Sequence, residues 1–319
     1  MDDLLTPAFR ALSAQLGQNP LRVQGPGGNT SIKAGNVMWI KASGTELANA
    51  ETDPIFVAVD RNAARAEAAG EGDGSCKATV LDPASTLRPS IETTFHAAID
   101  WPVVAHTHSI ATLVHAISPE GRQVAREKLT DLPAIFVPYA KPGLPLTRQI
   151  MARVTSDTSV IVLENHGLIC CGATVEATRD LIEEVERRLA MPIFAIKTAP
   201  PGPALPGFER ISESWMAYDR RITDLALAGS YYPDHVVFLG PALPKADHDG
   251  QPPVILIPDD GVYLRDGATL SQRAMIRCLS DCLARLPADW TISAIGPEAE
   301  AELLDWDAEK YRQALAARP

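Results

Sequence analysis

Three histidines have the residue type and the spacing that metal-dependent chemistry needs. His106 and His108 are separated by one residue within 103–109, VVAHTHS, a segment that predicts a buried strand. Side chains at positions i and i+2 of a strand point to the same side, so both imidazoles can reach one ion. His166 lies in ENHGL between two apolar runs. Three histidines with one open position are the usual plan of a catalytic zinc site.

A His-x-His pair alone does not establish a metal site, because two surface histidines often have the same spacing. A cupin also uses His-x-His, but it expects a glutamate a few residues downstream, where this chain reads SIAT at 109–112. The cupin interpretation therefore fails. The other four histidines are weaker candidates for ligands: His96, His115, His235 and His248.

Glu92 is the carboxylate whose position suits proton transfer beside such an ion. It lies fourteen residues before His106, in RPSIE at 88–92. A carboxylate near a metal can be a fourth ligand or a general acid and base. A glutamate at the start of a helix can also simply interact favourably with the helix dipole. The residue type alone leaves both interpretations open.

The segments around these residues predict the elements that must position them. Apolar spacing predicts helices, and short β-rich runs with Gly and Asn between them predict strands in antiparallel pairs. Helices are predicted at 4–17, 91–99 and 109–118, and after the N-cap Thr174. Strands are predicted at 25–33, 37–44, 103–109 and 134–140, and as two pieces around a polar turn at 160–172.

A proline-rich stretch, TAPPGPALPG at 198–207, predicts a linker. It divides the chain into an α/β catalytic domain, 1–198, and a smaller C-terminal α/β extension, 199–319. Within the extension, helices are predicted at 208–230 and 272–286, a strand at 236–240 and a hairpin at 253–264. Two aromatic and polar clusters, 231–235 and 306–311, could line the active site or an interface. Packing is the preferred interpretation, and they are assigned no catalytic role.

Composition narrows the class of protein. The net charge of −11 argues against nucleic acid or an anionic membrane as the main partner. No run of eighteen apolar residues predicts a transmembrane helix, and the N-terminus does not have the pattern of an export signal, so a cytoplasmic protein is expected. Five cysteines without a Cys-x-x-Cys pair predict buried thiols instead of disulfides or a cysteine zinc site.

Six motifs in one order resemble the class II aldolase/adducin family. They are GGNTSIK, KASGT, RPSIETTFHAAI, AHTHS, VPYAKPG and ENHGLICCG, within residues 5–195. The family includes zinc-dependent fuculose- and rhamnulose-phosphate aldolases and ribulose-phosphate 4-epimerases. The resemblance implies an α/β/α sandwich around a mostly antiparallel central sheet. It also implies a homotetramer whose active sites lie near subunit interfaces.

The resemblance assigns roles to matching positions. It implies that His106, His108 and His166 bind Zn²⁺, one ion per subunit, and that Glu92 transfers a proton. Tyr139 of VPYAKPG matches a tyrosine that donates a proton from a neighbouring subunit in some aldolases. The phosphate of the substrate would lie against Gly28, Asn29, Ser43, Gly44 and Ser90.

One position departs from the family pattern. Phosphate-using aldolases commonly have two serines before the glutamate, whereas Ser90 is followed here by Ile91. Isoleucine donates no hydrogen bond, so either the substrate has no phosphate or Arg88 or Lys41 supplies the counter-charge. The Pro-Ser-Ile motif and the long extension are similar to the aldolase half of bifunctional rhamnulose-phosphate aldolase/dehydrogenases. The Gly-x-Gly-x-x-Gly fingerprint of a dehydrogenase half is not found in the sequence.

The sequence therefore predicts a zinc-dependent aldehyde-lyase that cleaves a ketose, expected to be a 1-phosphate, by a retro-aldol reaction. Cleavage leaves negative charge on a carbon next to a carbonyl, and a Lewis-acidic metal stabilises the resulting enediolate. A sugar-phosphate 4-epimerase and a dehydratase remain open as alternatives that use the same site. A non-catalytic adducin-like module is disfavoured, because such modules dispense with the histidines that this chain keeps.

Overall fold

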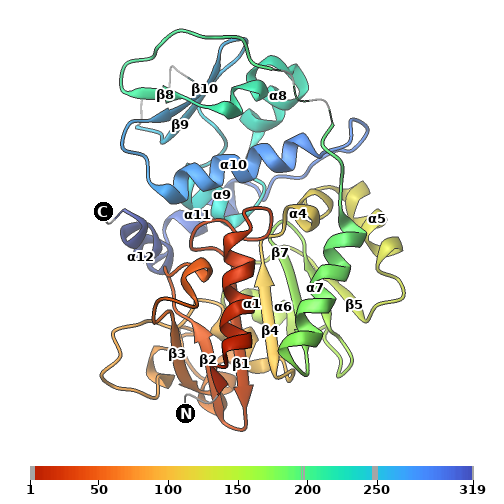
Figure 1. Cartoon of the computed structure of the whole chain (residues 1–319), viewed down its shortest axis with the longest axis vertical. Helices are drawn as coiled ribbons and strands as arrows, with labels where there is room; N and C mark the ends of the chain where they lie inside the picture. The colour runs from red at the N-terminus through yellow and green to blue at the C-terminus, as the bar shows by residue number, and fades with distance from the viewer. Residues whose placement is uncertain (1–3, 195, 197, 246–250, 318–319) are drawn as a thin grey trace.

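The computed structural model describes residues 4–194, 196, 198–245 and 251–317, so His248 lies outside the described residues. Within them, seven strands form a large sheet in the order β3-β2-β1-β4-β7-β6-β5, and three strands form a small sheet in the order β8-β10-β9 (Figure 1). The two sheets come from different parts of the chain, the large one from 29–172 and the small one from 208–265.

The large sheet is antiparallel at every pair of neighbours except β5 and β6, which run parallel. This confirms the expected mostly antiparallel sheet. Its strands are β1 Asn29–Ala34, β2 Val37–Lys41, β3 Phe56–Asp60, β4 Val103–Thr107, β5 Ala134–Val137, β6 Val160–Leu163 and β7 Gly167–Gly172.

Helices cover both faces of the large sheet, as expected for an α/β/α sandwich. Successive side chains of β4 point to opposite faces. Val103 and Ala105 pack in one apolar cluster, whereas Val104 packs in another with Phe95 and Ile150. The helices of the first face are α1 Pro7–Gln18 and α7 Val175–Leu189; those of the second are α2 Arg61–Ala69, α3 Thr93–Ala98 and α6 Leu144–Met151.

Helix caps fix where the chain leaves the sheet. Ser109 Oγ accepts a hydrogen bond from the backbone N–H of Thr112, so α4 (Ile110–Ala116) begins directly after His108. The predicted N-cap Thr174 is confirmed, because its hydroxyl accepts the backbone N–H of Ala177 at the start of α7. Helix α5, Pro119–Lys128, follows α4.

Two predictions for the C-terminal extension are wrong. Residues 236–240 were expected to form a strand, but α9, Pro233–Leu239, is a helix in which every residue is buried. A helix without a polar face has no helical periodicity, so its apolar run cannot be told from a strand. The segment 208–230 is not helical throughout, because it begins with strand β8, Phe208–Arg210, and a 3-10 turn, Ser212–Tyr218, before α8, Arg220–Ala228.

Other expectations for the extension are confirmed. The hairpin consists of β9, Val254–Ile257, and β10, Gly261–Arg265, in antiparallel register. The predicted helix at 272–286 is α10, Leu270–Ala284, and two shorter helices follow, α11 Pro297–Leu304 and α12 Asp307–Ala316. All five cysteines are buried and free, as the sequence predicts: Cys76, Cys170, Cys171, Cys278 and Cys282.

The extension packs on the sandwich through α4. Leu113 and Ile117 of this helix lie in one apolar cluster with Trp215, Val237 and Leu279 of the extension. In Figure 1, α9, α10 and α12 lie between the small sheet and the sandwich. The extension is therefore held close to the segment that carries His108, while the boundary proposed at residue 198 stays a prediction.

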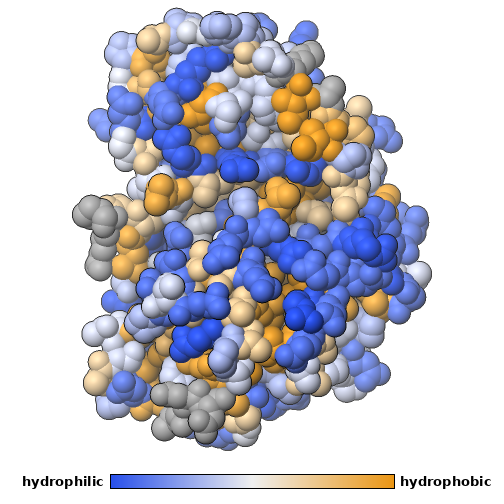
Figure 2. Space-filling view, in the orientation of Figure 1, coloured by the Kyte–Doolittle hydropathy of each residue, from blue (hydrophilic) through white to orange (hydrophobic). Residues whose placement is uncertain are grey.

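The surface is mixed in polarity. On the face shown in Figure 2, most exposed side chains are hydrophilic and the hydrophobic ones gather in separate patches. Among the described residues, we find no helix with the length and apolar character needed to cross a bilayer.

Candidate metal and catalytic site

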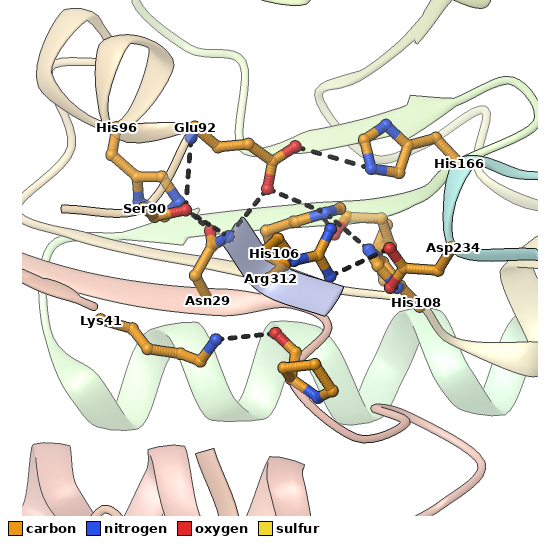
Figure 3. A network of polar contacts seen from close by, with 12 residues as sticks. Asn29, Lys41, Ser90, Glu92, His96, His106, His108, His166, Asp234 and Arg312 are labelled. Carbon is orange, nitrogen blue, oxygen red and sulfur yellow. Dashed lines mark hydrogen bonds and ion pairs between the residues drawn. The ribbon is translucent and has the colours of Figure 1, made fainter. Parts of the chain in front are cut away.

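The three predicted ligands converge at one point (Figure 3). His106 comes from β4, His108 from the residues that follow it, and His166 from the turn between β6 and β7. One ring nitrogen of each lies within 4.8 Å of the others, and all three side chains are buried. His106 Nε2 and His108 Nε2 are 3.2 Å apart.

The turn that presents His166 depends on both of its neighbours. Asn165 has a φ of 54°, a left-handed conformation that asparagine tolerates. Its side-chain amide donates to the carbonyl oxygens of Tyr231 and Ser293 in the extension, at 3.0 and 2.7 Å. A Cβ at Gly167 would lie 2.3 Å from the carbonyl oxygen of Thr107, so only glycine fits there. The ENHG motif is therefore explained by turn geometry and close approach.

Glu92 precedes α3 and points at the histidines. Its Oε2 is 3.5 Å from His106 Nε2, and its Oε1 is 3.5 Å from His166 Nε2. Asn29 Nδ2 donates to Glu92 Oε2 at 2.8 Å and to Ser90 Oγ at 3.1 Å. Among the described residues, the buried Oε1 accepts no hydrogen bond. A buried carboxylate oxygen without a donor needs an explanation, and a bound cation is one.

The electrostatics of the cluster suit a divalent cation. Burial lowers the pKa of His166 to about 3 and also lowers the pKa of His106. Both rings are thus neutral at pH 7, as metal ligands must be. Burial raises the pKa of Glu92, but the histidines and Asn29 outweigh burial and hold it below its ordinary value. Three imidazole nitrogens beside one carboxylate match the donor set of a zinc enzyme.

The residues predicted to hold a phosphate surround the same place. They line a cavity of about 20 Å³ together with Glu92, His108 and His166. All five predicted positions take part in this lining: Gly28, Asn29, Ser43, Gly44 and Ser90. Two of them, Gly28 and Gly44, have positive φ values of 58° and 77°, which explains glycine at these turns.

Tyr139 does not line this cavity. It follows β5, half-buried, and burial raises its pKa, with further contributions from Glu302 and Glu300 of the extension. Its hydroxyl has no hydrogen-bond partner among the described residues. The predicted role of Tyr139 requires a neighbouring subunit and stays a prediction.

Two charged residues of the extension line the cavity, and neither was expected there from the sequence. Asp234, on α9, has Oδ2 3.2 Å from His108 Nδ1, and Arg312, on α12, has Nη2 3.0 Å from Asp234 Oδ1. The sequence predicted packing at 231–235 and a strand at 236–240, so no signal marked Asp234 as part of a site. Packing explains Tyr231 and Tyr232, which lie in the apolar core of the extension. It does not explain Asp234.

His96 stabilises the site through hydrogen bonds to Asn29 and Ser31. Its Nε2 is hydrogen-bonded to Asn29 Oδ1, and its Nδ1 to Ser31 Oγ at 2.7 Å. Lys33 Nζ donates to the backbone carbonyl of His96 at 2.6 Å. The network fixes the orientation of Asn29 and, through it, that of Glu92.

Lys33 makes stability depend on pH. Burial lowers its pKa to about 7, whereas an unfolded lysine has a pKa of about 10.4. Between these values the unfolded chain binds the proton and the folded chain does not, so the free energy of unfolding rises with pH. We expect Lys33→Met to remove a slope of roughly 1.4 kcal/mol per pH unit between pH 7.5 and 9.5, measured by urea unfolding.

Lys77→Met is the matched control for this measurement. Lys77 is exposed, so its replacement is expected to leave the slope of the wild type unchanged. Equal slopes for wild type and Lys33→Met would contradict the prediction.

Comparison with known proteins gives matches within the first two thirds of the chain. The family profile described as "Class II Aldolase and Adducin N-terminal domain" matches residues 10–193. The "Uncharacterized oxidoreductase YuxG" of Bacillus subtilis is 30% identical over an alignment of 184 residues that covers 50% of this chain and 26% of that protein. The L-fuculose phosphate aldolase of Methanocaldococcus jannaschii is 28% identical over 170 residues, 50% of this chain and 77% of that protein.

Solved structures agree with these matches. The N-terminal class II aldolase domain of a conserved protein from Thermoplasma acidophilum superposes with a TM-score of 0.52 and 26% identity. It covers 59% of this chain and 92% of that domain. The chain spans only about a quarter of the length of YuxG. Glu92 and the three histidines lie inside the region that the family profile matches, whereas Asp234 and Arg312 lie beyond it.

Proposed function

Because the chain belongs to the class II aldolase and adducin family, we propose that it is a zinc-dependent aldolase that cleaves a ketose, with a ketose 1-phosphate as substrate. The observation that carries the proposal is a buried carboxylate, Glu92, 3.5 Å from two of three converging histidines. The similarity to the L-fuculose phosphate aldolase of Methanocaldococcus jannaschii supports the substrate class.

In this proposal, His106, His108 and His166 hold the cation. When bound, the zinc ion supplies Lewis-acid stabilisation of negative charge on the oxygens of the substrate. Because burial lowers the pKa values of His106 and His166, these two rings are neutral and their nitrogen lone pairs are available to the ion.

Glu92 transfers the proton to and from carbon C3 of the substrate. In the cleavage direction, the Glu92 carboxylate accepts the proton of the C4 hydroxyl, the C3–C4 bond breaks, the aldehyde leaves, and the electron pair stays at C3. Glu92 returns a proton to C3, and Asn29 keeps the carboxylate oriented by its hydrogen bond to Oε2. Burial raises the pKa of Tyr139, so its phenol keeps its proton. Tyr139 of a neighbouring subunit in the expected homotetramer is our candidate for the hydrogen-bond donor to the oxygen of the departing aldehyde.

The substrate needs more room than the cavity at the histidines offers. A volume of about 20 Å³ holds one water molecule. An adjoining cavity of about 820 Å³ shares Ser43, Ile91 and Pro142 with it and is also lined by Arg88 and Lys141. We propose that the anionic end of the substrate lies in this larger cavity, where the two cations offset the missing serine at position 91.

The proposal is tested by incubating the purified protein and Zn²⁺ with a panel of ketose 1-phosphates, followed by mass spectrometry. We expect two fragments, a triose phosphate and an aldehyde. An isomer of unchanged mass would indicate the 4-epimerase, and the loss of water would indicate the dehydratase. A protein that binds no metal and converts no substrate would support the non-catalytic module instead.

A further inference from the structure

The second ring nitrogens of two histidines contact acceptor oxygens. His106 Nδ1 is 3.0 Å from the backbone carbonyl oxygen of Leu168, in the neighbouring strand of the sandwich. His108 Nδ1 instead lies 3.2 Å from the Oδ2 of Asp234, which belongs to the extension (Figure 3). A proton on Nδ1 that faces such an acceptor leaves the lone pair of Nε2 free for a metal.

Asp234 is held in place for this contact. Its side chain is only 2% exposed, and a buried carboxylate is stable only with a partner. Arg312 supplies the partner at Oδ1, 3.0 Å away, and is itself paired with Glu309 at 2.8 Å. Among the described residues, the buried Oδ2 has no hydrogen-bond partner, and the ring nitrogen Nδ1 of His108 lies 3.2 Å from it. One oxygen thus anchors Asp234, and the other faces the histidine.

Gly27 provides the room in which the two side chains meet. A Cβ at this position would lie 2.8 Å from His108 Nδ1 and 2.9 Å from Asp234 Oδ2. Gly27 does not have a positive φ, so backbone conformation does not explain why it is glycine. The contact between His108 and Asp234, together with the backbone carbonyl oxygen of Gln24 at 3.0 Å, explains the absence of a side chain at Gly27.

We infer that Asp234 is a positioning residue for the metal ligand His108. Asp234 takes the Nδ1–H hydrogen bond, holds the ring with Nε2 toward the ion and makes Nε2 more basic, while Arg312 anchors Asp234. The extension therefore completes the metal centre from outside the region that the family profile matches. The inference rests on the proposed metal site and not on which sugar is cleaved.

The affinity for zinc tests the inference without any substrate. Zn²⁺ is titrated into metal-free protein in competition with a chromophoric chelator. Loss of an outer partner of a metal-binding histidine typically costs about 10–100-fold in metal affinity, and we expect this loss for Asp234→Ala. We expect roughly a tenfold loss for Asp234→Asn, whose amide oxygen still accepts a hydrogen bond but has no charge. Asp224→Asn, on the exposed side of α8, is the control and keeps wild-type affinity.

Gly27→Ala provides a second test that leaves every charge in place. The added methyl group forces His108 and Asp234 apart, so zinc affinity is again expected to fall by about tenfold or more. Thermal unfolding of the metal-free variants shows whether each is folded. Asp234→Asn, nearly the same size as the wild-type residue, decides the outcome if Asp234→Ala does not fold.

The inference is overturned if folded Asp234→Asn and Gly27→Ala both bind zinc within twofold of the wild type. A different result would refute the aldolase proposal. A wild type that binds zinc but cleaves no ketose would refute that proposal and leave the measurement on Asp234 intact.

Discussion

His108→Ala is expected to lower zinc affinity by more than about 100-fold, which exceeds the typical cost of losing an outer partner. The substitution removes one of three nitrogens that lie within 4.8 Å of one another and leaves Asp234 facing an empty space. A Lewis-acidic metal supplies several kcal/mol to such a reaction, and each 1.36 kcal/mol is tenfold in rate. Ketose cleavage should therefore fall by roughly 10³-fold or more, in parallel with the zinc content measured by mass spectrometry.

His115→Gln is the matched control. His115 is also buried, but it bonds to the backbone carbonyl of Ala111 and packs against the ring of Trp290, away from the cavity. This variant is expected to keep its zinc. If His108→Ala also kept both zinc and activity, the three histidines would not be the metal site.

Most residues that the structure brings together at the candidate site were expected from the sequence, because their signals are local. His106 and His108 are two residues apart on β4, so one short strand aligns them without knowledge of the rest of the fold. Asn165 and Gly167 around His166 are residue types that a tight turn requires. The strands of the large sheet were predicted from local signals in the same way, because they are short and end at turn residues.

The parts that the sequence did not predict depend on contacts between distant segments. Asp234 reaches His108 only because α9 packs with α4 in one apolar cluster, and no periodicity encodes that packing. The same burial hid the type of α9 itself, because a helix that is buried on every side shows no alternation between an exposed and a buried face. Arg312 enters the cavity from α12, more than two hundred residues after His108 in the sequence.

Glu92→Gln is expected to keep its zinc and lose its proton transfer. The amide has nearly the shape of the carboxylate and can still accept the hydrogen bond from Asn29, so the three histidines stay in place. It cannot carry a proton to or from carbon, and removal of a general acid and base typically costs about 10²–10⁴-fold. Turnover should fall by that amount at nearly unchanged zinc content.

Proton exchange separates this role from the other steps of the reaction. Without an aldehyde, Glu92 should exchange a hydroxymethyl proton of the triose phosphate product with deuterium from the solvent, and Glu92→Gln should lose this exchange. Glu176→Gln, on the exposed side of α7, should exchange like the wild type. Retained exchange in Glu92→Gln would remove Glu92 from the proton transfer and leave it as an electrostatic partner of the histidines. Loss of exchange at full zinc content identifies the carboxylate as the group that handles the proton.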